Sequence, residues 1–529
     1  MTLDRRSALT GGISFLSAAS ITPAAAAAPA PSGPAPGWYD VRHFGATGDG
    51  HTLDTPAVNR AIAQAAASGG GTIYFPPGTY ACHSIRLKSR ITLHLDGAAT
   101  LLAAPAPTDG RGGYDLAEPQ DPAIEPFQDF GHNHWRNSLI WGEGLHDIAI
   151  TGSGLIWGKG LGRGDGKDAY LSDPNGPGTG NKAIALKNCH NVLLRDLRML
   201  ACGWFAILAT GVDHLTIDNL LIDTTRDGMD IDCCRNVRIT NCTVNSPYDD
   251  GICPKSSYAL GEPRATENLT IANCFVTGNY EVGSLIDGSW RKMPPSFAPT
   301  VHGRIKFGTE SNGGFRNITI SNCVFDDSQG LALETVDGAL FEDVTISNIA
   351  MRGSFSSPLF LRLGRRMRGP AGRPIGSMRR ILIDNVTSSG AGWLPSIIAG
   401  LPGHPIEDVK ISNVFVEQRG GAPEAMAHRV PPLAELAYPE PNMFGDLPVT
   451  GFFIRDARNI EMSHVEVAVA AADPRPAFRL ENVEDADFFR LRVPTGAPAF
   501  SLDRVRGFRH FGSHRIEDSR FDDLVSKTL

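Results

Sequence analysis

The sequence lacks several features that would narrow its function at once. After residue 40 it has no apolar run long enough to cross a bilayer, and helix-favouring runs are scarce. The 49 Lys and Arg residues do not outnumber the 57 Asp and Glu residues, so the net charge of −8 gives no electrostatic reason to expect nucleic acid or an anionic membrane as a partner. The 529 residues, 58 of them Gly, predict a globular protein of one large or two ordinary domains.

The cysteines show no spacing typical of a metal site. No pair among the nine is matched with His at zinc-ligand distances in the sequence. Cys242, Cys274 and Cys323 each follow an Asn at one repeated place. We expect most of the cysteines to be buried as small hydrophobic residues, while a disulfide through Cys233 or Cys234 stays open.

Residues 1–37 predict an export signal followed by a linker. Arg5 and Arg6 precede a short, weakly apolar stretch, an Ala-rich zone and a Pro/Ala segment. The apolar part is too short to span a bilayer. The twin arginine is typical of a bacterial Tat signal, with a Sec signal as the alternative. We therefore expect a periplasmic or secreted mature protein.

The middle of the chain is built from repeats. Each unit alternates β-branched residues or Leu with polar residues at period two, which predicts a strand, and units begin as little as 22 residues apart. Units this short bury their apolar faces only by stacking. The fold predicted is all-β, a right-handed parallel β-helix with an N-terminal capping helix. Asn stands eighth in seven units and is expected to form a ladder: Asn219, Asn241, Asn273, Asn322, Asn348, Asn385 and Asn413.

The predicted solenoid is closed at its start and interrupted by insertions. Thr55 and Pro56 open an amphipathic helix that runs to about Ser68 and would cover the first coil. We divide the chain into the export segment, an N-terminal cap with the first coils (38–105) and a β-helix domain (106–529). Its long Gly/Pro-rich insertions are expected to wall a cleft: 107–136, 158–180 and 278–302.

One stretch, residues 223–257, concentrates acidic residues. Asp227 and Asp249 are both sixteenth in their units, so we expect them to stack on neighbouring coils. Asp250 follows directly, and Asp230 lies one strand step from Asp227. Crowded carboxylates raise one another's pKa, and a proton-holding carboxyl beside ionised ones is what glycoside hydrolysis requires. Solvated turn aspartates and a calcium site remain alternative interpretations.

The sequence resembles the polygalacturonase-like glycoside hydrolases, family 28. "FGATGDGHTLDTPAVNRAI" with "GGGTIYFPPGTY" resembles the cap of the wider pectin-degrading β-helix group, "TRDGMDID" is similar to the family's Asn-Thr-Asp-Gly-x-Asp motif, and "YDDGICPKSS" is similar to its Asp-Asp motif. The resemblance implies Asp249 as general acid, Asp227 and Asp250 as holders of the attacking water, and Asp230 in support. It also implies inversion of configuration without a metal or other cofactor.

The sequence departs from this family at the sugar-binding motifs. The family's Gly-His-Gly motif has no clean match. Counting coils puts Glu281 in the column of Asp227, and His302 follows after a loop. The family's Arg-Ile-Lys motif, which holds a galacturonate carboxylate, appears literally at Arg304 and Lys306. Coil counting instead puts Ala332 and Glu334 where those cations belong. A neutral sugar such as rhamnose then becomes the alternative to a uronic acid.

Other residues are candidates for contact with a sugar. Lys255 follows the Asp pair on its strand, and it is otherwise an exposed strand lysine. Trp204 is predicted one coil below Asp227, whereas Tyr280 and Trp290 lie in an insertion; each is alternatively rim packing. The segment 438–467 is similar to bacterial members of the family and is expected to close the solenoid.

Three functions are therefore compared. The first is an exported inverting hydrolase of plant cell-wall polysaccharide of the polygalacturonase or rhamnogalacturonan type, including a rhamnosidase-type specificity at the same site. The second is a calcium-dependent pectate-lyase-like enzyme, and the third is a non-catalytic carbohydrate-binding β-helix. The sequence does not determine the oligomeric state, the linkage or exo versus endo action.

Overall fold

A computed structural model describes most of the chain after the predicted export signal. The described residues are 37–107, 111–119, 121–129, 131–132, 134–162, 178–294, 301–390 and 392–529. The export signal itself lies outside them, apart from Gly37. Within these ranges no helix has the length and apolarity that a membrane crossing requires.

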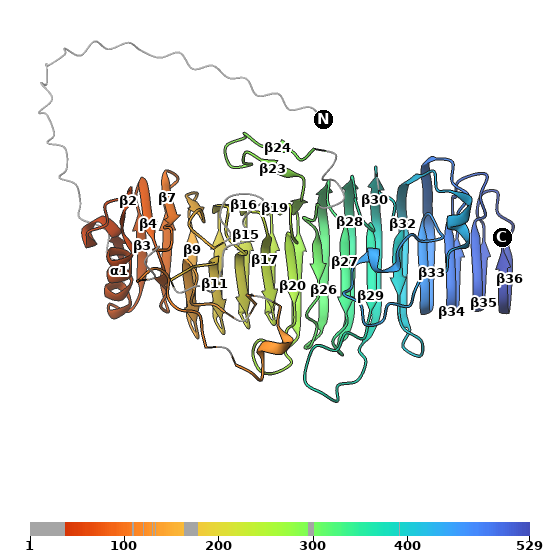
Figure 1. The fold of residues 1–529 in the computed structure, drawn as a ribbon, viewed down its shortest axis with the longest axis horizontal. Helices are drawn as coiled ribbons and strands as arrows, with labels where there is room; N and C mark the ends of the chain where they lie inside the picture. Colours follow the sequence, from red (N-terminus) through yellow and green to blue (C-terminus); the bar gives the residue numbers. More distant parts are fainter. Residues whose placement is uncertain are drawn as a thin grey trace, which may run out of the picture. The chain divides into compact units, whose positions relative to one another are not determined.

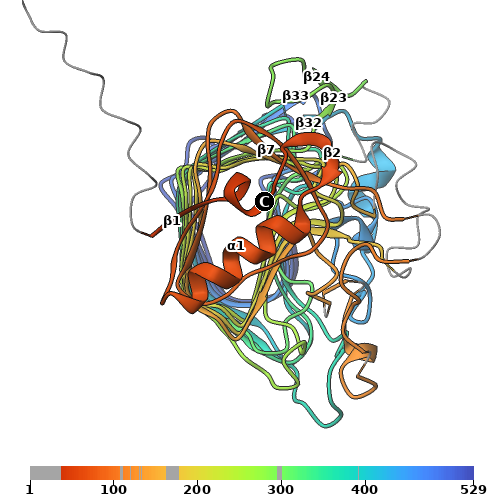
Figure 2. The same ribbon diagram turned by 90° about the vertical axis from the view of Figure 1, so that its left-hand side faces the viewer.

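The described chain from Gly37 onward winds into coils that stack along one axis (Figure 1). One 34-stranded sheet runs through the stack, and the strands of successive coils pair in parallel, which confirms the predicted right-handed parallel β-helix. Seen along the axis, the coils superimpose around one apolar interior (Figure 2). Strands of successive coils form three faces, which we name the site face, the long face and the third face.

The site face carries the predicted acidic residues. Its strands, in chain order, are β5 (Ile85–Arg86), β8 (Ile140–Glu143), β11 (Lys182–Lys187), β14 (Phe205–Thr210), β17 (Asp227–Asp232), β20 (Ile252–Lys255), β25 (Ile305–Phe307), β27 (Leu331–Thr335), β29 (Leu359–Leu363) and β31 (Ser396–Ala399).

The other two faces complete each coil. The long face consists of β1 (Trp38–Asp40), β3 (Gly71–Phe75), β6 (Ile91–Leu95), β9 (His146–Thr151), β12 (His190–Arg195), β15 (Asp213–Asp218), β18 (Arg235–Thr240) and β21 (Thr266–Ala272). The third face consists of β2 (Asp49–Leu53), β4 (Gly78–Cys82), β7 (Ala99–Ala103), β10 (Leu155–Trp157), β13 (Arg198–Leu200), β16 (Leu221–Asp223), β19 (Thr243–Asn245) and β22 (Phe275–Thr277).

Later coils run through two or all three of the faces in single long strands. These are β26 (Phe315–Asp326), β28 (Leu340–Arg352), β30 (Ser377–Ser389), β32 (Ile406–Gly420), β33 (Phe452–Ala471), β34 (Phe478–Phe489) and β35 (Phe500–Phe511). Outside the stack, β23 (Tyr280–Val282) and β24 (Arg291–Lys292) form an antiparallel hairpin of their own. Short 3-10 turns occur at Val41–Phe44, Glu125–Phe127, Glu424–His428 and Pro441–Phe444.

Apolar side chains stacked inside the coils fix the register of the site face. Ile207, Met229, Ile252 and Ile305 pair in sequence from one coil to the next, and all four are fully buried. A slip of one residue would turn every such side chain outward, so the interior specifies the register strongly. All nine cysteines are buried and free, as predicted for most of them, and neither Cys233 nor Cys234 forms a disulfide.

The two ends of the solenoid are closed differently. Helix α1 (Thr55–Ala67), with Pro56 in its first turn, lies across the first coil and buries its Ala, Val and Ile face, as predicted (Figure 2). At the other end β36 (Ser519–Thr528) pairs antiparallel with β35. The prediction that residues 438–467 close the solenoid is wrong, because two further parallel coils, β34 and β35, follow them.

The predicted asparagine ladder is present in the middle of the chain. Its members have φ of 55–59°, the left-handed region that Asn tolerates better than most residues. From Asn273 to Asn385, each side-chain amide donates to the Asn of the preceding coil at 3.0–3.3 Å. The residues concerned are Asn241, Asn273, Asn322, Asn348 and Asn385.

At both ends of this ladder an aspartate replaces asparagine as the acceptor. Asn241 donates to Asp218 at 2.8 Å, and Asn413 donates to Asp384 at 2.9 Å. Both carboxylates lie one residue before the ladder position, and an ionised acceptor gives the stronger hydrogen bond. The stacking of turns therefore continues where the Asn-to-Asn bond stops.

Replacing Asn322 should separate the two contributions of the ladder. Asn322→Ala loses two amide bonds and places Ala in the left-handed region, so we expect a loss of about 2 kcal/mol in the free energy of unfolding. Asn322→Gly loses the same bonds without the backbone penalty and should lose less. Urea unfolding of both variants measures the difference. Equal midpoints for the two variants would contradict the backbone contribution.

Candidate active site

The coil register brings the predicted aspartates together, with one correction. Met229 pairs with Ile252, and that coil holds one more residue in its turn than the repeat predicts. Extending this register puts Asp250, rather than Asp249, across from Asp227. The predicted stacking of Asp227 on Asp249 is therefore wrong by one residue, because the alignment of units did not include the longer turn.

The four carboxylates nevertheless form one connected group. Side-chain oxygens lie within 4.8 Å of each other for Asp227 and Asp250, for Asp249 and Asp250, and for Asp227 and Asp230. Asp230 is fully buried, Asp227 and Asp250 are nearly so, and the side chain of Asp249 is 22% exposed. Asp249 is thus the member of the group that solvent reaches most readily.

The protein gives Asp227 and Asp250 opposite protonation tendencies. Burial, then the charges of Asp249 and Asp230, raise the pKa of Asp227 well above its ordinary value. Burial also acts to raise the pKa of Asp250, but the charges of Arg304 and Lys306 outweigh it and hold that pKa below its ordinary value. The cluster therefore combines a proton-holding carboxyl with an ionised one.

Asp249 is bound by Arg226, the residue that directly precedes Asp227. The guanidinium of Arg226 lies 2.5 Å from a carboxylate oxygen of Asp249 and stacks at 4.3 Å on the ring of Trp204. The prediction that Trp204 lies in the column of Asp227 is wrong, because Phe205 pairs with Asp227. Trp204 instead supports Arg226, at the edge of the cluster.

The literal Arg-Ile-Lys motif lies beside the aspartates. Arg304 Nε donates to Asp250 at 2.6 Å, and Lys306 Nζ is 3.5 Å from the other oxygen of Asp250. Lys306 pairs with Ala332, so Glu334 lies further along the next strand, with its carboxylate 4.0 Å from Lys306. Coil counting failed here because β23 of the 278–302 insertion pairs with β24 in a separate hairpin and not with a strand of the coils.

Glu281 does not belong to the column of Asp227. It lies on β23, whose partner is β24 in the separate hairpin, and its side chain is outside the described part of the structure. His302, by contrast, is half-buried and has a ring nitrogen within 4.8 Å of oxygens of Asp249 and Asp250. Burial and the charge of Arg304 lower the pKa of His302, which favours a neutral imidazole.

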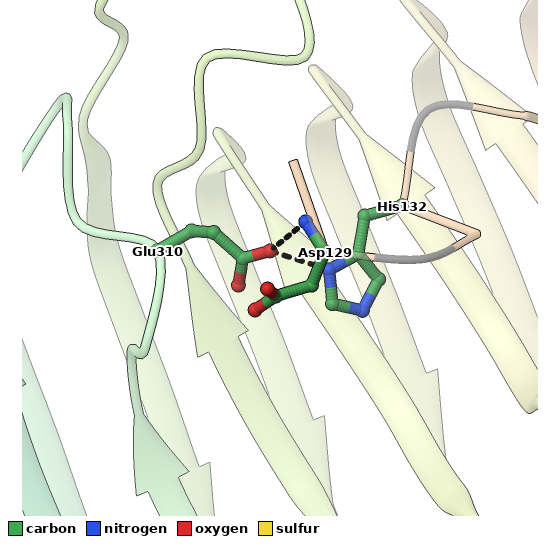
Figure 3. A group of neighbouring side chains, drawn as sticks. All are labelled: Asp129, His132 and Glu310. Carbon is green, nitrogen blue, oxygen red and sulfur yellow. Dashed lines mark hydrogen bonds and ion pairs between the residues drawn. The ribbon is translucent and has the colours of Figure 1, made fainter. Parts of the chain in front are cut away.

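A buried histidine from the 107–136 insertion enters the cluster from outside the coils. His132 Nε2 is 3.0 Å from Asp230, and Nδ1 is 2.7 Å from Glu310, which also accepts the backbone N–H of Asp129 at 3.0 Å (Figure 3). Lys255 is buried and reaches Glu310 from the other side at 3.2 Å. Lys255 is therefore not the exposed strand lysine of the alternative interpretation.

The charge on His132 follows from these contacts. Burial acts to lower the pKa of His132, but the charge of Glu310 and the hydrogen bonds to Asp230 and Glu310 outweigh it and raise the pKa to about 10. His132 and Lys255 in turn hold the pKa of Glu310 well below its ordinary value. Two cations thus offset Asp230 and Glu310 in a region without water access.

A hollow with aromatic walls adjoins the carboxylates. It encloses about 250 Å³, and its lining includes Thr225 and Tyr248, which directly precede Arg226 and Asp249. Tyr280 also lines it and stacks on Trp290 of the hairpin, with ring centroids 4.4 Å apart. The described part of the 278–302 insertion thus contributes one wall of this hollow, and its role beside the carboxylates stays a prediction. A larger hollow, about 940 Å³, lies at the C-terminal end around Arg492 and Lys527.

Two known families each match a part of the chain, and a known protein matches most of it. A family described as rhamnogalacturonase A/epimerase, pectate lyase-like, matches residues 38–140, and a right-handed β-helix family matches residues 169–292. A probable polygalacturonase of Vitis vinifera is 24% identical over 412 residues, which are 70% of this chain and 73% of that protein. The chain is a polygalacturonase-like β-helix protein.

Solved structures support the same fold for this polygalacturonase-like chain. The family 28 exopolygalacturonase of Yersinia enterocolitica superposes with a TM-score of 0.61 and 20% identity, over 87% of this chain and 78% of that one. The hyperthermoactive exopolygalacturonase of Thermotoga maritima gives 0.56 and 18%, over 93% and 95%. At these identities the likeness concerns the fold alone.

Another relative is named for binding and not for hydrolysis. The plasmin and fibronectin-binding protein A of Streptococcus pneumoniae is 28% identical over 263 residues, which are 46% of this chain and 32% of that protein. Part of this chain is thus similar to part of a protein named for binding. The relationship by itself does not separate catalysis from binding in this polygalacturonase-like chain.

Sequence reasoning missed the residues that offset the cluster's charge. His132, Glu310 and Glu440 lie far from the acidic motif in the sequence, and none belongs to a repeated position. The only available signal was the "GHNHW" stretch within a Gly/Pro-rich insertion, and nothing in that stretch says which coil it would reach.

Cationic side chains contact the carboxylates that are close enough together to hold a metal ion. Four groups in the described residues bring three potential ligand atoms within 4.8 Å, and in each a carboxylate already contacts His132, Lys255, Arg226 or Arg304. An imidazolium offers no lone pair to a metal. A calcium ion would have to displace these cations from the same carboxylate oxygens. Catalysis without a metal stays a prediction.

The stability of the chain should depend on pH through His132. A histidine with a pKa raised to about 10 stabilises the fold fully below its unfolded pKa of about 6.5, and loses that contribution as pH rises through 10. His132→Gln should cost about 3 kcal/mol at pH 6, because it leaves buried carboxylates uncompensated.

The measurement is urea unfolding of both proteins between pH 6 and 10. The difference between wild type and His132→Gln should shrink across this range. The exposed histidine His428 provides a control, and His428→Gln should show no such trend. A difference for His132→Gln that stays constant with pH would contradict the charged state assigned to His132.

Proposed function

We propose that this chain is an exported glycoside hydrolase that cleaves glycosidic bonds in pectic polysaccharide of the plant cell wall. The observation that carries the proposal is the connected group of four carboxylates on adjacent coils, in which Asp227 favours its protonated form and Asp250 its ionised form. Hydrolysis of a glycoside needs both states at once. The relatives named as polygalacturonases support the substrate class.

The roles follow the resemblance and fit the electrostatics. We assign to Asp249 the proton that the site holds at rest on Asp227, because the charge of Asp249 is among the causes that raise the pKa of Asp227. Asp249, the more exposed member, donates this proton to the departing glycosidic oxygen. As the bond breaks, positive charge develops on the sugar, and nearby carboxylates stabilise it.

The water nucleophile is assigned to the other side of the group. Asp250 is ionised and lies within 4.8 Å of Asp227, so the two can hold one water between them. Asp227 helps to orient that water, and the ionised Asp250 accepts its proton while it attacks the anomeric carbon. Asp230, held by His132, supports Asp227 and is not in contact with the sugar. Attack from the face opposite the departing oxygen inverts the anomeric configuration.

Replacement of the acidic residues tests the assignment. Asp249→Asn and Asp250→Asn should each lower kcat about 10³-fold on the substrate cleaved, since each removes a proton-transfer or water-orienting group. Asp213→Asn is the matched control, because Asp213 is a partly exposed aspartate on the neighbouring coils, bound to Arg264 outside the cluster. Release of reducing ends from polygalacturonate and rhamnogalacturonan measures activity. Retention of kcat by either cluster variant would overturn the assignment.

The identity of the first product tests the mechanism. Proton NMR of a fresh digest should show the anomer opposite to that of the bond cleaved, and a chelator should leave the rate unchanged. A product with a C4–C5 double bond, together with loss of activity in chelator, would replace hydrolysis by calcium-dependent elimination. Saccharide binding that is equal in wild type and Asp249→Asn, with no cleavage by either, would favour a binding protein instead.

A further inference from the structure

Two buried cations of the cluster are already neutralised by the protein itself. The side chains of Arg304 and Lys306 are 1% and 3% exposed, on the coil next to Asp250. Paired cations beside a sugar site ordinarily bind a sugar carboxylate, and Arg does so through two parallel hydrogen bonds. In this chain Glu440 already makes this two-point contact, because its two carboxylate oxygens accept hydrogen bonds from Arg304 Nη1 (2.8 Å) and Nη2.

The remaining donors of the two cations are also engaged. Arg304 Nε donates to Asp250, which leaves no edge of the guanidinium open for a second two-point contact. Lys306 Nζ is 3.3 Å from Glu440, and it lies over the ring of Tyr438 at 5.1 Å from the centroid. A substrate carboxylate would have to displace Glu440 before it could reach either cation.

The net charge of this group is balanced without a ligand. Arg304 and Lys306 are offset by Asp250 and Glu440; their charges lower the pKa of Glu440 to about 2, although burial acts to raise it. Burial raises the pKa of Glu334 to about 8, with the charge of Lys306 acting against it, so Glu334 is neutral in mildly acidic solution. An added carboxylate would bring an uncompensated negative charge into this region.

Glu440 is held in place by the chain segment that carries it. Residues 431–449, which we name the crossing segment, cover the outer side of β27, β29 and β31. Its Phe444 and Leu447 are buried against Phe360 and Ile397 of these strands. Arg362 on β29 donates to the carbonyls of Leu433 and Ala434 at 3.1 Å. These contacts make Glu440 a fixed part of the site.

We propose that Glu440 is a specificity-determining residue that supplies an internal carboxylate to Arg304 and Lys306, so that the sugar subsite beside them takes a neutral sugar. The inference deepens the proposed function and rests on it for the location of the sugar. Tyr438, half exposed and hydrogen-bonded to Thr309 at 2.8 Å, presents an aromatic ring at the same place. An uncharged sugar can pack on such a ring without meeting the internal carboxylate.

The experiment compares a uronic acid with its uncharged form. Digalacturonate and its methyl diester differ in charge and little in shape, and titration calorimetry at pH 6 gives their Kd for the full chain. Wild type should bind the diester at least tenfold more tightly. Glu440→Gln keeps the side chain's size and removes its charge, so it should gain at least tenfold in affinity for digalacturonate relative to the diester.

A variant of a second glutamate in the crossing segment serves as the control. Glu435→Gln removes a carboxylate from the same crossing segment, where Glu435 pairs with Arg365 away from the cluster, and it should leave both affinities unchanged. Tighter binding of digalacturonate than of the diester by wild type, or no gain in Glu440→Gln, would overturn the inference. These are binding measurements, so they stand whether or not any glycoside is hydrolysed, whereas failure of the proposed function appears as absence of cleavage.

Discussion

The parallel backbone hydrogen bonds between β17, β20 and β25 are the constraint on which the site depends. They bring Asp227, Asp250 and Arg304, which are far apart in the sequence, onto adjacent coils about 4.8 Å apart. Side chains on such coils point in the same direction, so acidic residues there meet whether or not their charges favour it. The apolar stack of Met229 and Ile252 inside the coils supplies the energy that keeps this register.

Crowding of carboxylates has a cost, and the structure shows where it is offset. Asp250 and Glu440 are compensated by Arg304 and Lys306 on the site face, whereas Asp230 and Glu310 are compensated by His132 and Lys255. Asp227 lies between the two sets, within 4.8 Å of Asp230 and Asp250, and favours its protonated form. Two compensated regions thus flank one carboxyl that holds a proton, and this difference in protonation is the property from which an acid/base function follows.

The compensating groups come from segments that are not coils. His132 enters from the 107–136 insertion, and Glu440 enters from the crossing segment, which begins more than 100 residues after the Arg-Ile-Lys motif. The coils provide a regular array of positions, and the insertions modify its charge. A segment outside the coils can therefore change the charge of the site while the acidic residues on the coils stay the same.

The sequence alone determined the solenoid, its capping helix, the asparagine ladder and the acidic group, because each arises from short-range periodicity or from residues within one or two coils. It misplaced Asp249 by one residue and put Glu281 in a coil that does not exist, since the length of a turn or an excursion leaves no periodic signal. Only the tertiary structure decided that Arg304 and Lys306 lie beside Asp250 and that Glu440 already occupies them. Contacts of that kind join distant segments through single side chains, and no local pattern specifies which distant partner a charged residue will meet.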